Sequence, residues 1–163
     1  MELDSNINSI NTQPIGAQDA TMLLKADHKL VGQLFDDYEQ CNSTSKKKHI
    51  VEEICKELSI HAQVEEEIFY PAVQKALHDH ELVPEAIVEH STLKDLIAAV
   101  KGVEPDGDMY DAKIKVMCEY VKHHVKEEEN EMFVEAKSTD LDMVELGALM
   151  GERKTQLINK YVK

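Results

Sequence analysis

A histidine stands inside each of four apolar series in this chain, and this pattern limits the folds that the chain can adopt. Within each series the apolar residues recur at intervals of three and four, which places them on one face of an α-helix. Each histidine therefore belongs to the buried face of its own helix. In two of the series a glutamate follows the histidine four residues later and shares that face. These residues are His28, His61, Glu65, His90, His124 and Glu128.

The chain also contains an approximate internal repeat. A lone histidine precedes an H-x-x-x-E pair by 33 residues in the first half and by 34 residues in the second. The segment HAQVEEE at residues 61–67 parallels HVKEEEN at residues 124–130. Such a repeat predicts two helical hairpins that pack with pseudo-twofold symmetry around a shared centre.

Composition favours long helices over many short strands, because turn-forming residues are scarce. The 163 residues include six glycines and four prolines, and aromatic residues make up 5%. A chain of this length has room for one compact domain. The expected fold is all-α, an antiparallel up-down four-helix bundle over residues 19–137 with a flexible N-terminal arm over residues 1–18. Residues 138–163 are expected to form an additional C-terminal helix, packed on the bundle or at a dimer contact.

Capping residues and turns predict where the helices begin and end. Asp19 is expected to cap the first helix, and Thr139, with Asp142 three residues later, is expected to cap the fifth. Pro71 is expected to kink the end of the second helix. The five helices are expected at about residues 19–40, 46–77, 81–104, 108–137 and 139–161.

The six inward residues have the chemistry of a metal site. Imidazole and carboxylate groups are ligands of transition metals, and a carboxylate buried without a cation costs several kcal/mol. Six residues overfill a tetrahedral zinc site, whereas helical bundles hold carboxylate-bridged metal pairs. Four histidines, two bridging glutamates and an oxo or hydroxo bridge leave roughly two of about twelve positions open on two octahedral ions. We therefore expect two iron ions, with manganese or zinc as substitutes, and a small ligand at the open positions.

Four local sequences resemble the hemerythrin family, specifically its HHE cation-binding branch. They are LLKADH, HAQVEEEIFYP, EHSTL and HHVKEEENEMF, and the resemblance covers about residues 20–137. The resemblance implies that the six inward residues are the ligands of a non-haem di-iron centre. The apolar series select the same six residues independently.

Two positions depart from the pattern of the oxygen-carrying hemerythrins. Those proteins have a second histidine on the third helix, four residues from the first, where this chain has Ala86 and Lys94 around His90. They also have H-x-x-x-x-D on the fourth helix, where this chain has Glu129. With one histidine fewer the centre is more open, so sensing, iron handling or peroxide chemistry is expected rather than reversible O₂ carriage.

Five further residues are candidates for a place near the centre. Tyr38 and Tyr120 could face the core and hydrogen-bond a bound ligand, although packing alone would also explain them. Glu131 lies on nearly the same helical face as the histidine of the fourth helix. Asp27 and Glu89 each precede a lone histidine and could accept a hydrogen bond from an imidazole N–H group.

The remaining histidines are expected on the surface or in connections. His124 is preferred over His123 as the inward residue, because His123 lies 100° away from the apolar face. The histidines expected to be exposed are His49, His78, His80 and His123.

Three functions stay open on the sequence alone. The first is a hemerythrin-like di-iron protein that binds O₂ or NO or handles iron in a sensing, storage or protective role. The second is an enzyme that decomposes peroxide at the same centre, although the chain shows no separate nucleophile or Gly-rich loop. The third is a metal-free helical interaction module.

Charge and cysteine content limit the expected partners and compartment. The net charge is −14, with 18 basic and 32 acidic residues, so nucleic acids and anionic membranes are not expected partners. The three cysteines show no C-x-x-C spacing, and the first residues lack the basic and apolar segments of a signal peptide. We expect a cytoplasmic protein whose partner is a small diatomic ligand or peroxide, with a homodimer contact through the C-terminal helix as a further possibility.

Overall fold

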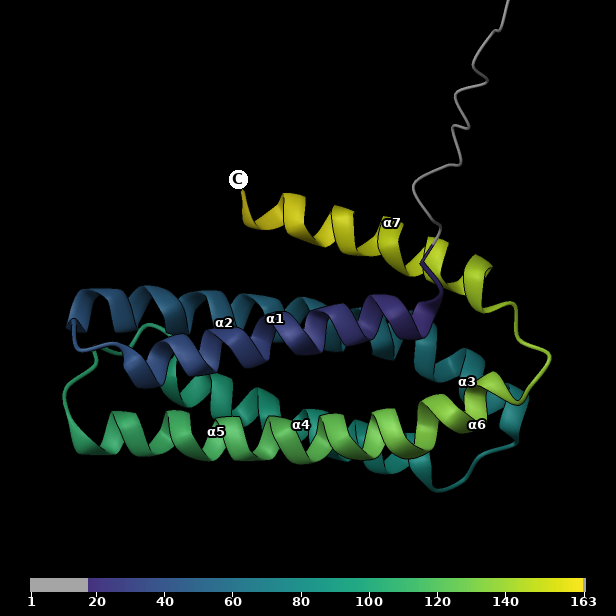
Figure 1. Ribbon diagram of the computed structural model, residues 1–163, viewed down its shortest axis with the longest axis horizontal. Helices are drawn as coiled ribbons and strands as arrows, with labels where there is room; N and C mark the ends of the chain where they lie inside the picture. The colour runs from purple at the N-terminus through teal and green to yellow at the C-terminus, as the bar shows by residue number, and fades with distance from the viewer. Residues whose placement is uncertain (1–17, 163) are drawn as a thin grey trace, which may run out of the picture.

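The computed structural model describes residues 18–162, and within this range the chain is helical without any strand. Four helical rods run up and down in an antiparallel bundle, and a fifth rod lies across one side of it (Figure 1). The expected all-α bundle with an additional C-terminal helix is therefore confirmed for the described residues. The expected N-terminal arm lies outside them, except for residue 18.

Two of the rods are interrupted by a π-helical turn. The first rod is α1 (Ala20–Gln40), and the third is α4 (Leu82–Val100). The second rod consists of α2 (Thr44–Val64), η1 (Glu65–Phe69) and α3 (Tyr70–Leu77). The fourth rod consists of α5 (Asp108–Glu127), η2 (Glu128–Met132) and α6 (Phe133–Lys137). The fifth rod is α7 (Met143–Tyr161).

Side-chain caps explain where the first and last helices begin. Asp19 caps α1 as predicted, because its carboxylate accepts a hydrogen bond from the backbone N–H of Met22 at 3.0 Å. The predicted cap of the last helix at Thr139 is wrong. α7 is capped by Asp142, which accepts from two backbone N–H groups of the first turn, whereas the Thr139 hydroxyl donates to a carbonyl oxygen of α6. The carboxylate of Asp142 also interacts favourably with the helix dipole.

Each π-helical turn begins at one of the two inward glutamates, Glu65 and Glu128. Pro71 follows the first turn, but the repeat places Val134 at the equivalent position after the second turn. Proline is therefore not the common cause of the two irregular turns. The departure from α-helical geometry begins at Glu65 rather than at the predicted Pro71. Such π turns inside α-helices occur frequently at functional sites.

Buried apolar residues form two clusters, one toward each end of the bundle. The cluster beside α3, α6 and α7 contains Phe69 and Phe133, and the other cluster contains Ile54. The inward polar residues lie between the two clusters and separate them. Along α4, Ile87 precedes His90 by three residues but is 43% exposed, and Ala86 is buried instead.

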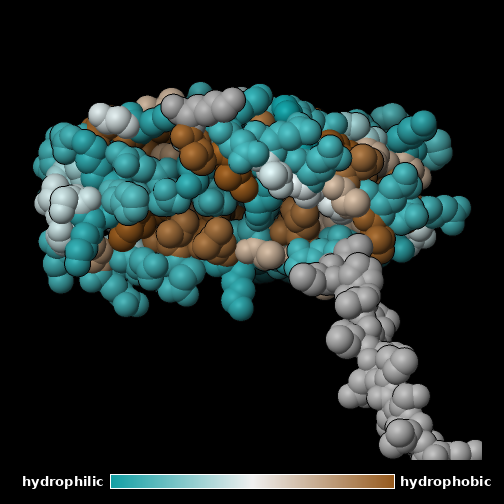
Figure 2. All heavy atoms as spheres, turned by 90° about the horizontal axis from the view of Figure 1, so that it is seen from above, coloured by the Kyte–Doolittle hydropathy of each residue, from teal (hydrophilic) through white to brown (hydrophobic). Residues whose placement is uncertain are grey.

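α7 packs on α1 and α2, on the side of the molecule away from α4 and α5 (Figure 1). Its buried apolar side chains are Leu146, Met150 and Leu157. Seen from above, the molecule presents a mainly hydrophilic face on which hydrophobic side chains form small separate groups (Figure 2). Among the described residues, no helix combines the length and the apolar character needed to cross a membrane.

A glycine allows α7 to approach the start of α1 closely. A Cβ atom at Gly147 would clash with the carbonyl oxygen of Gln18 and lie 2.9 Å from the backbone nitrogen of Ala20. Both obstacles are backbone atoms, which cannot turn away as a flexible side chain can. By contrast, a Cβ atom at Gly151 would make an ordinary contact at 3.6 Å with Leu23.

We expect Gly147→Ala to lower the free energy of unfolding by about 1–3 kcal/mol, because α7 must move away from α1 to admit the methyl group. Gly151→Ala is the matched control on the same helix. Because alanine has a higher helix propensity than glycine, this variant should leave stability unchanged or raise it by up to about 1 kcal/mol. Urea unfolding measures both. Equal stabilities for the two variants would contradict the close approach at Gly147.

Candidate metal centre

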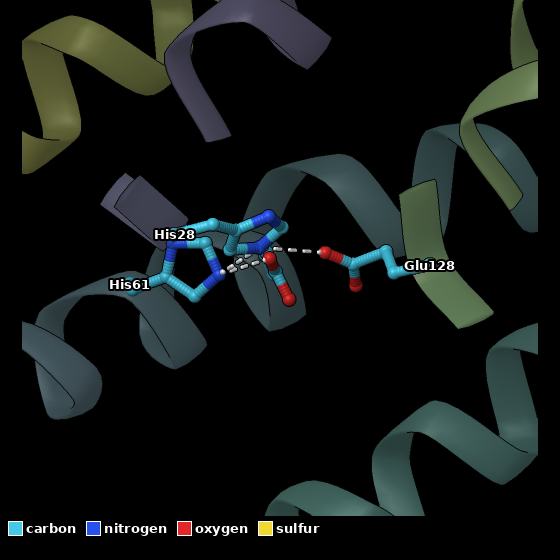
Figure 3. A group of neighbouring side chains, drawn as sticks. His28, His61 and Glu128 are labelled. Atoms are coloured by element: carbon cyan, nitrogen blue, oxygen red, sulfur yellow. Dashed lines mark hydrogen bonds and ion pairs between the residues drawn. The ribbon is translucent and has the colours of Figure 1, made fainter. Parts of the chain in front are cut away.

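The six inward residues predicted from the sequence come together in the middle of the bundle. Their potential ligand atoms form two groups that share one glutamate, and the atoms within each group lie within 4.8 Å of one another. The groups are His28, His61, Glu65 and Glu128, and Glu65, His90 and His124. All six side chains are at most 9% exposed. Figure 3 shows His28, His61 and Glu128 pointing toward one another from α1, α2 and η2.

In the first group, histidines of α1 and α2 face the two glutamates. The Nε2 atom of His61 lies 2.5 Å from Oε1 of Glu65 and 3.2 Å from Nε2 of His28. The same atom of His28 lies 3.2 Å from Oε1 of Glu128. Four side chains from separate helical segments therefore direct nitrogen and oxygen atoms at one small region.

The second group repeats this arrangement in the other half of the bundle. Nε2 of His90 lies 3.2 Å from Oε2 of Glu65, and Nε2 of His124 lies 3.4 Å from Oε2 of Glu128. Each glutamate therefore presents one oxygen atom to a histidine of the first half and the other oxygen atom to a histidine of the second half. This is the pseudo-twofold arrangement that the internal repeat predicts.

The two buried glutamates have few hydrogen bonds that would compensate their charge. Both carboxylate oxygens of Glu65 and the Oε1 atom of Glu128 have no hydrogen-bond partner, and neither does Nδ1 of His90. His61 is close to Glu65, but its approach lacks the geometry of a hydrogen bond. An isolated buried carboxylate costs several kcal/mol, and two neighbouring ones also repel each other. A cation between the two carboxylates removes this cost, so the donor set fits a bound metal.

The histidines of the two H-x-x-x-E pairs are held from outside by carboxylates. Asp27 accepts a hydrogen bond from Nδ1 of His61 at 3.0 Å, and Glu89 accepts one from Nδ1 of His124. A proton on Nδ1 leaves the lone pair of Nε2 free on the inner side. Each acceptor contacts the histidine of the neighbouring helix in its hairpin, rather than the histidine that it precedes in the sequence.

The two lone histidines face carboxylates from the opposite half of the bundle. Nδ1 of His28 lies 3.0 Å from Oε1 of Glu129. In the equivalent place Glu66 is 3.9 Å from Nδ1 of His90, too far for a hydrogen bond. Lys94 holds that carboxylate instead, at 2.8 and 2.9 Å.

The surrounding carboxylates shift the proton affinity of the histidines. Burial by itself would lower the pKa of His61, but the Glu65 and Asp27 carboxylates outweigh burial and raise the pKa from 6.5 to about 10. The pKa of His124 is raised to about 10 by the equivalent carboxylates of the second half, again against burial. A cation that binds at Nε2 of either histidine therefore competes with a proton.

Tyr70 joins the centre although the sequence pattern does not select it. Its hydroxyl donates to Oε2 of Glu128 at 2.7 Å and lies 3.1 Å from Nε2 of His90. Burial and the Glu65 and Glu128 carboxylates raise the pKa of Tyr70 well above its usual value, so the phenol keeps its proton at neutral pH. Phe133 occupies the equivalent place in the repeat. The two halves therefore differ, with a hydroxyl in one and a phenyl ring in the other.

The other candidate residues do not belong to the two ligand groups. Tyr38 is buried, but its hydroxyl donates to an aspartate of α5 at 2.5 Å. Tyr120 is half-buried and Glu131 is exposed, and neither belongs to a ligand group. The side chain of His123 is 62% exposed, against 9% for His124, as the helical register predicts. The other histidines expected on the surface are also exposed, namely His49, His78 and His80.

Comparison with known proteins finds similarity over most of the chain. The family model described as hemerythrin HHE cation binding domain matches residues 19–136. A crystal structure of a hemerythrin HHE cation binding domain-containing protein from Mycobacterium kansasii is similar with a TM-score of 0.76 and 25% identity, covering 89% of this chain and 90% of that chain. A DNA nickase from a Nostoc species is 29% identical over 129 residues, which are 78% of this chain and 36% of that protein. This chain thus spans about a third of the length of the nickase.

Chelator-treated protein is expected to lose stability as the pH rises from about 6.5 to about 10. In this range the folded protein keeps protons on His61 and His124 that the unfolded chain has released, so a rise in pH favours the unfolded chain. Urea unfolding at a series of pH values measures the slope. His61→Gln should flatten the slope, whereas His123→Gln should keep it because His123 is exposed. A wild-type slope no steeper than that of His61→Gln would contradict the raised pKa.

Proposed function

Because the chain belongs to the hemerythrin HHE cation-binding family, we propose that its buried histidines and glutamates hold two iron ions. The observation that carries this proposal is that both glutamates are shared between the two halves, each with one oxygen atom toward either half. The proposed ligands are His28, His61, His90 and His124, with Glu65 and Glu128 between the ions. Imidazole and carboxylate ligands suit iron, and manganese or zinc are the expected substitutes. When bound, the iron pair supplies open coordination positions for a small ligand.

A small apolar cavity beside the histidines has room for such a ligand. The cavity has a volume of about 20 Å³ and lies between the four histidines and the apolar core. Its apolar walls include Val31, Leu58, Leu93 and Val121. A volume of roughly 10–15 Å³ on this measure holds one water molecule. The cavity therefore has room for a diatomic ligand such as O₂ or NO, which supports a sensing or protective role.

Peroxide decomposition is the second candidate function, and Tyr70 is the observation that favours it. The phenol keeps its proton and places it within hydrogen-bond distance of Glu128, inside the centre. Peroxide chemistry requires proton transfer to an oxygen atom, and a positioned tyrosine can act as the donor. The hydroxyl also orients the carboxylate that it contacts.

Neither DNA nor a membrane is among the proposed partners. The net charge of −14 repels phosphate groups, and the matched part is about a third of the Nostoc nickase, so the activity of that protein is not extended to this chain. A homodimer through the outer face of α7 stays a prediction. On that helix Val144, Leu149 and Tyr161 are each about half exposed.

We expect the wild-type chain, purified under reducing conditions, to bind about two irons, because its donor set divides into two groups. His124→Ala should lower the iron content to about one or less, since it removes a buried ligand. His123→Ala should have a smaller effect. His49→Ala is the matched surface control, because His49 also precedes a glutamate by four residues but is exposed. Equal losses in His124→Ala and His49→Ala would contradict the proposed ligand set.

Adding NO and H₂O₂ separately to the iron-loaded protein distinguishes the two candidate functions. Binding of NO, seen as new visible absorption bands, with no O₂ release from H₂O₂ above that of free iron, is expected for a binding protein. Rapid O₂ release that Tyr70→Phe lowers by about tenfold or more, with unchanged iron content, would favour the enzyme instead. Absence of both responses would contradict the proposal that the centre takes a small ligand.

A further inference from the structure

The two halves of the bundle differ in what covers the centre from outside. In the first half, Lys154 of α7 pairs with Asp27, the same residue that holds His61. Glu89 holds His124 in the second half, but α7 lies on the opposite side of the molecule (Figure 1). A positively charged side chain therefore covers one of two equivalent approaches to the centre.

A groove opens on the second half, where α7 is not present. It has a volume of about 50 Å³ and lies between α4 and the rod of α5 and η2. Its acidic side chains, which we call the acidic rim, are Glu85, Glu89, Glu127 and Glu131. His123 stands beside the rim, with Nε2 at 3.2 Å from Glu127. Together with Glu89 these two residues form a third group whose ligand atoms lie within 4.8 Å of one another.

The internal repeat shows that two residues of the acidic rim are specific to the second half, whereas Glu89 has an acidic counterpart in Asp27. The positions equivalent to Glu127 and Glu131, 63 residues earlier, are Val64 and Ile68. Val64 is 1% exposed, and Ile68 packs against the apolar cluster to which α7 contributes. The same positions are thus apolar where α7 covers the bundle and acidic where the bundle is open.

The groove leads to atoms of the centre itself. His124 and Glu128, which belong to the two ligand groups, line the groove together with the acidic rim. Glu128 is 3% exposed. Its Oε2 atom lies 3.4 Å from Nε2 of His124, and its Oε1 atom, which faces His28, has no hydrogen-bond partner. Glu89 connects the third group with the centre, because it belongs to that group and also accepts a hydrogen bond from His124.

We propose that this groove is the entrance through which a divalent metal cation reaches the buried centre, with Glu89, His123 and Glu127 as the first binding site. This inference rests on the proposed function, because an entrance requires a metal centre behind it. Four carboxylates around a small opening raise the local cation concentration and the association rate. The imidazole and two carboxylates can replace part of the hydration shell before the cation passes to His124 and Glu128.

The rate of iron loading tests the entrance separately from the capacity of the centre. Chelator-treated full-length protein is mixed with Fe²⁺ without O₂, loading is stopped at set times with excess chelator, and the retained iron per chain is measured. The test variant is Glu127→Gln/Glu131→Gln, which removes two rim charges and leaves the six proposed ligands in place. Glu89 is not changed, because it also holds His124. The matched control, Glu39→Gln/Glu119→Gln, removes the same charge at two exposed positions outside the groove.

We expect the rim variant to load about tenfold more slowly than the control at low ionic strength, and to reach the same final iron content. At about 0.5 M salt the difference should largely disappear, because screening weakens the attraction of the rim. Equal rates for the two variants, with normal loading of the wild type, would overturn the entrance but not the centre. A lower final iron content in the rim variant would also overturn the entrance, since the acidic rim would then hold metal permanently instead of passing it on. Wild-type protein that retains no iron would overturn the proposed function, and the entrance with it.

Discussion

Two carboxylate groups buried in an apolar bundle are the constraint on which the rest of this structure depends. Three of the four carboxylate oxygens of Glu65 and Glu128 lack a hydrogen-bond partner, so only a surrounding set of positive or metal-binding groups can compensate their charge. Each of the four long rods supplies one histidine to that set. An outer set of carboxylates then holds three of the four histidines in orientation, namely His28, His61 and His124. The two buried glutamates are thus surrounded first by histidines and then by outer carboxylates. The two apolar clusters fill the bundle toward either end.

The departures from pseudo-twofold symmetry show how two similar hairpins acquire different roles. Tyr70 and Phe133 occupy equivalent positions, yet one brings a hydroxyl to the centre and the other stacks on His28 with its ring centroid at 6.0 Å. α7 covers the first hairpin, where the surface positions are apolar, and leaves the second hairpin open. The symmetric residues therefore hold the centre, whereas the asymmetric ones determine which side is reactive and which side is accessible.

The sequence predicts the bundle and the inward residues well because both follow from regular helical spacing. Four residues make slightly more than one turn, so His61 and Glu65 share a face without any knowledge of the fold. Regular helical spacing does not predict Tyr70, since five residues of α-helix would place it about 140° away from Glu65. Asp27 and Glu89 accept hydrogen bonds from imidazole N–H groups as expected, but the histidine that each one holds lies on a neighbouring helix, which depends on packing rather than on spacing. The spacing of Thr139 and Asp142 resembles a capping box, but Asp142 itself is the cap, because its carboxylate accepts the backbone hydrogen bonds of the first turn.

The π-helical turns let one continuous rod direct its side chains at the polar centre along one part of its length and at an apolar cluster along the next. In η1 the backbone N–H of Tyr70 bonds to the carbonyl of Glu65, five residues earlier, so the wider turn accommodates an extra residue. If that residue were absent, the α-helical ladder would continue unbroken and everything after it would rotate by about 100°. Phe69 and Val73, both fully buried, would then turn toward solvent or toward the wrong neighbour. Each π-helical turn therefore changes the helical register at the point where the rod passes from the polar centre to the apolar end of the bundle.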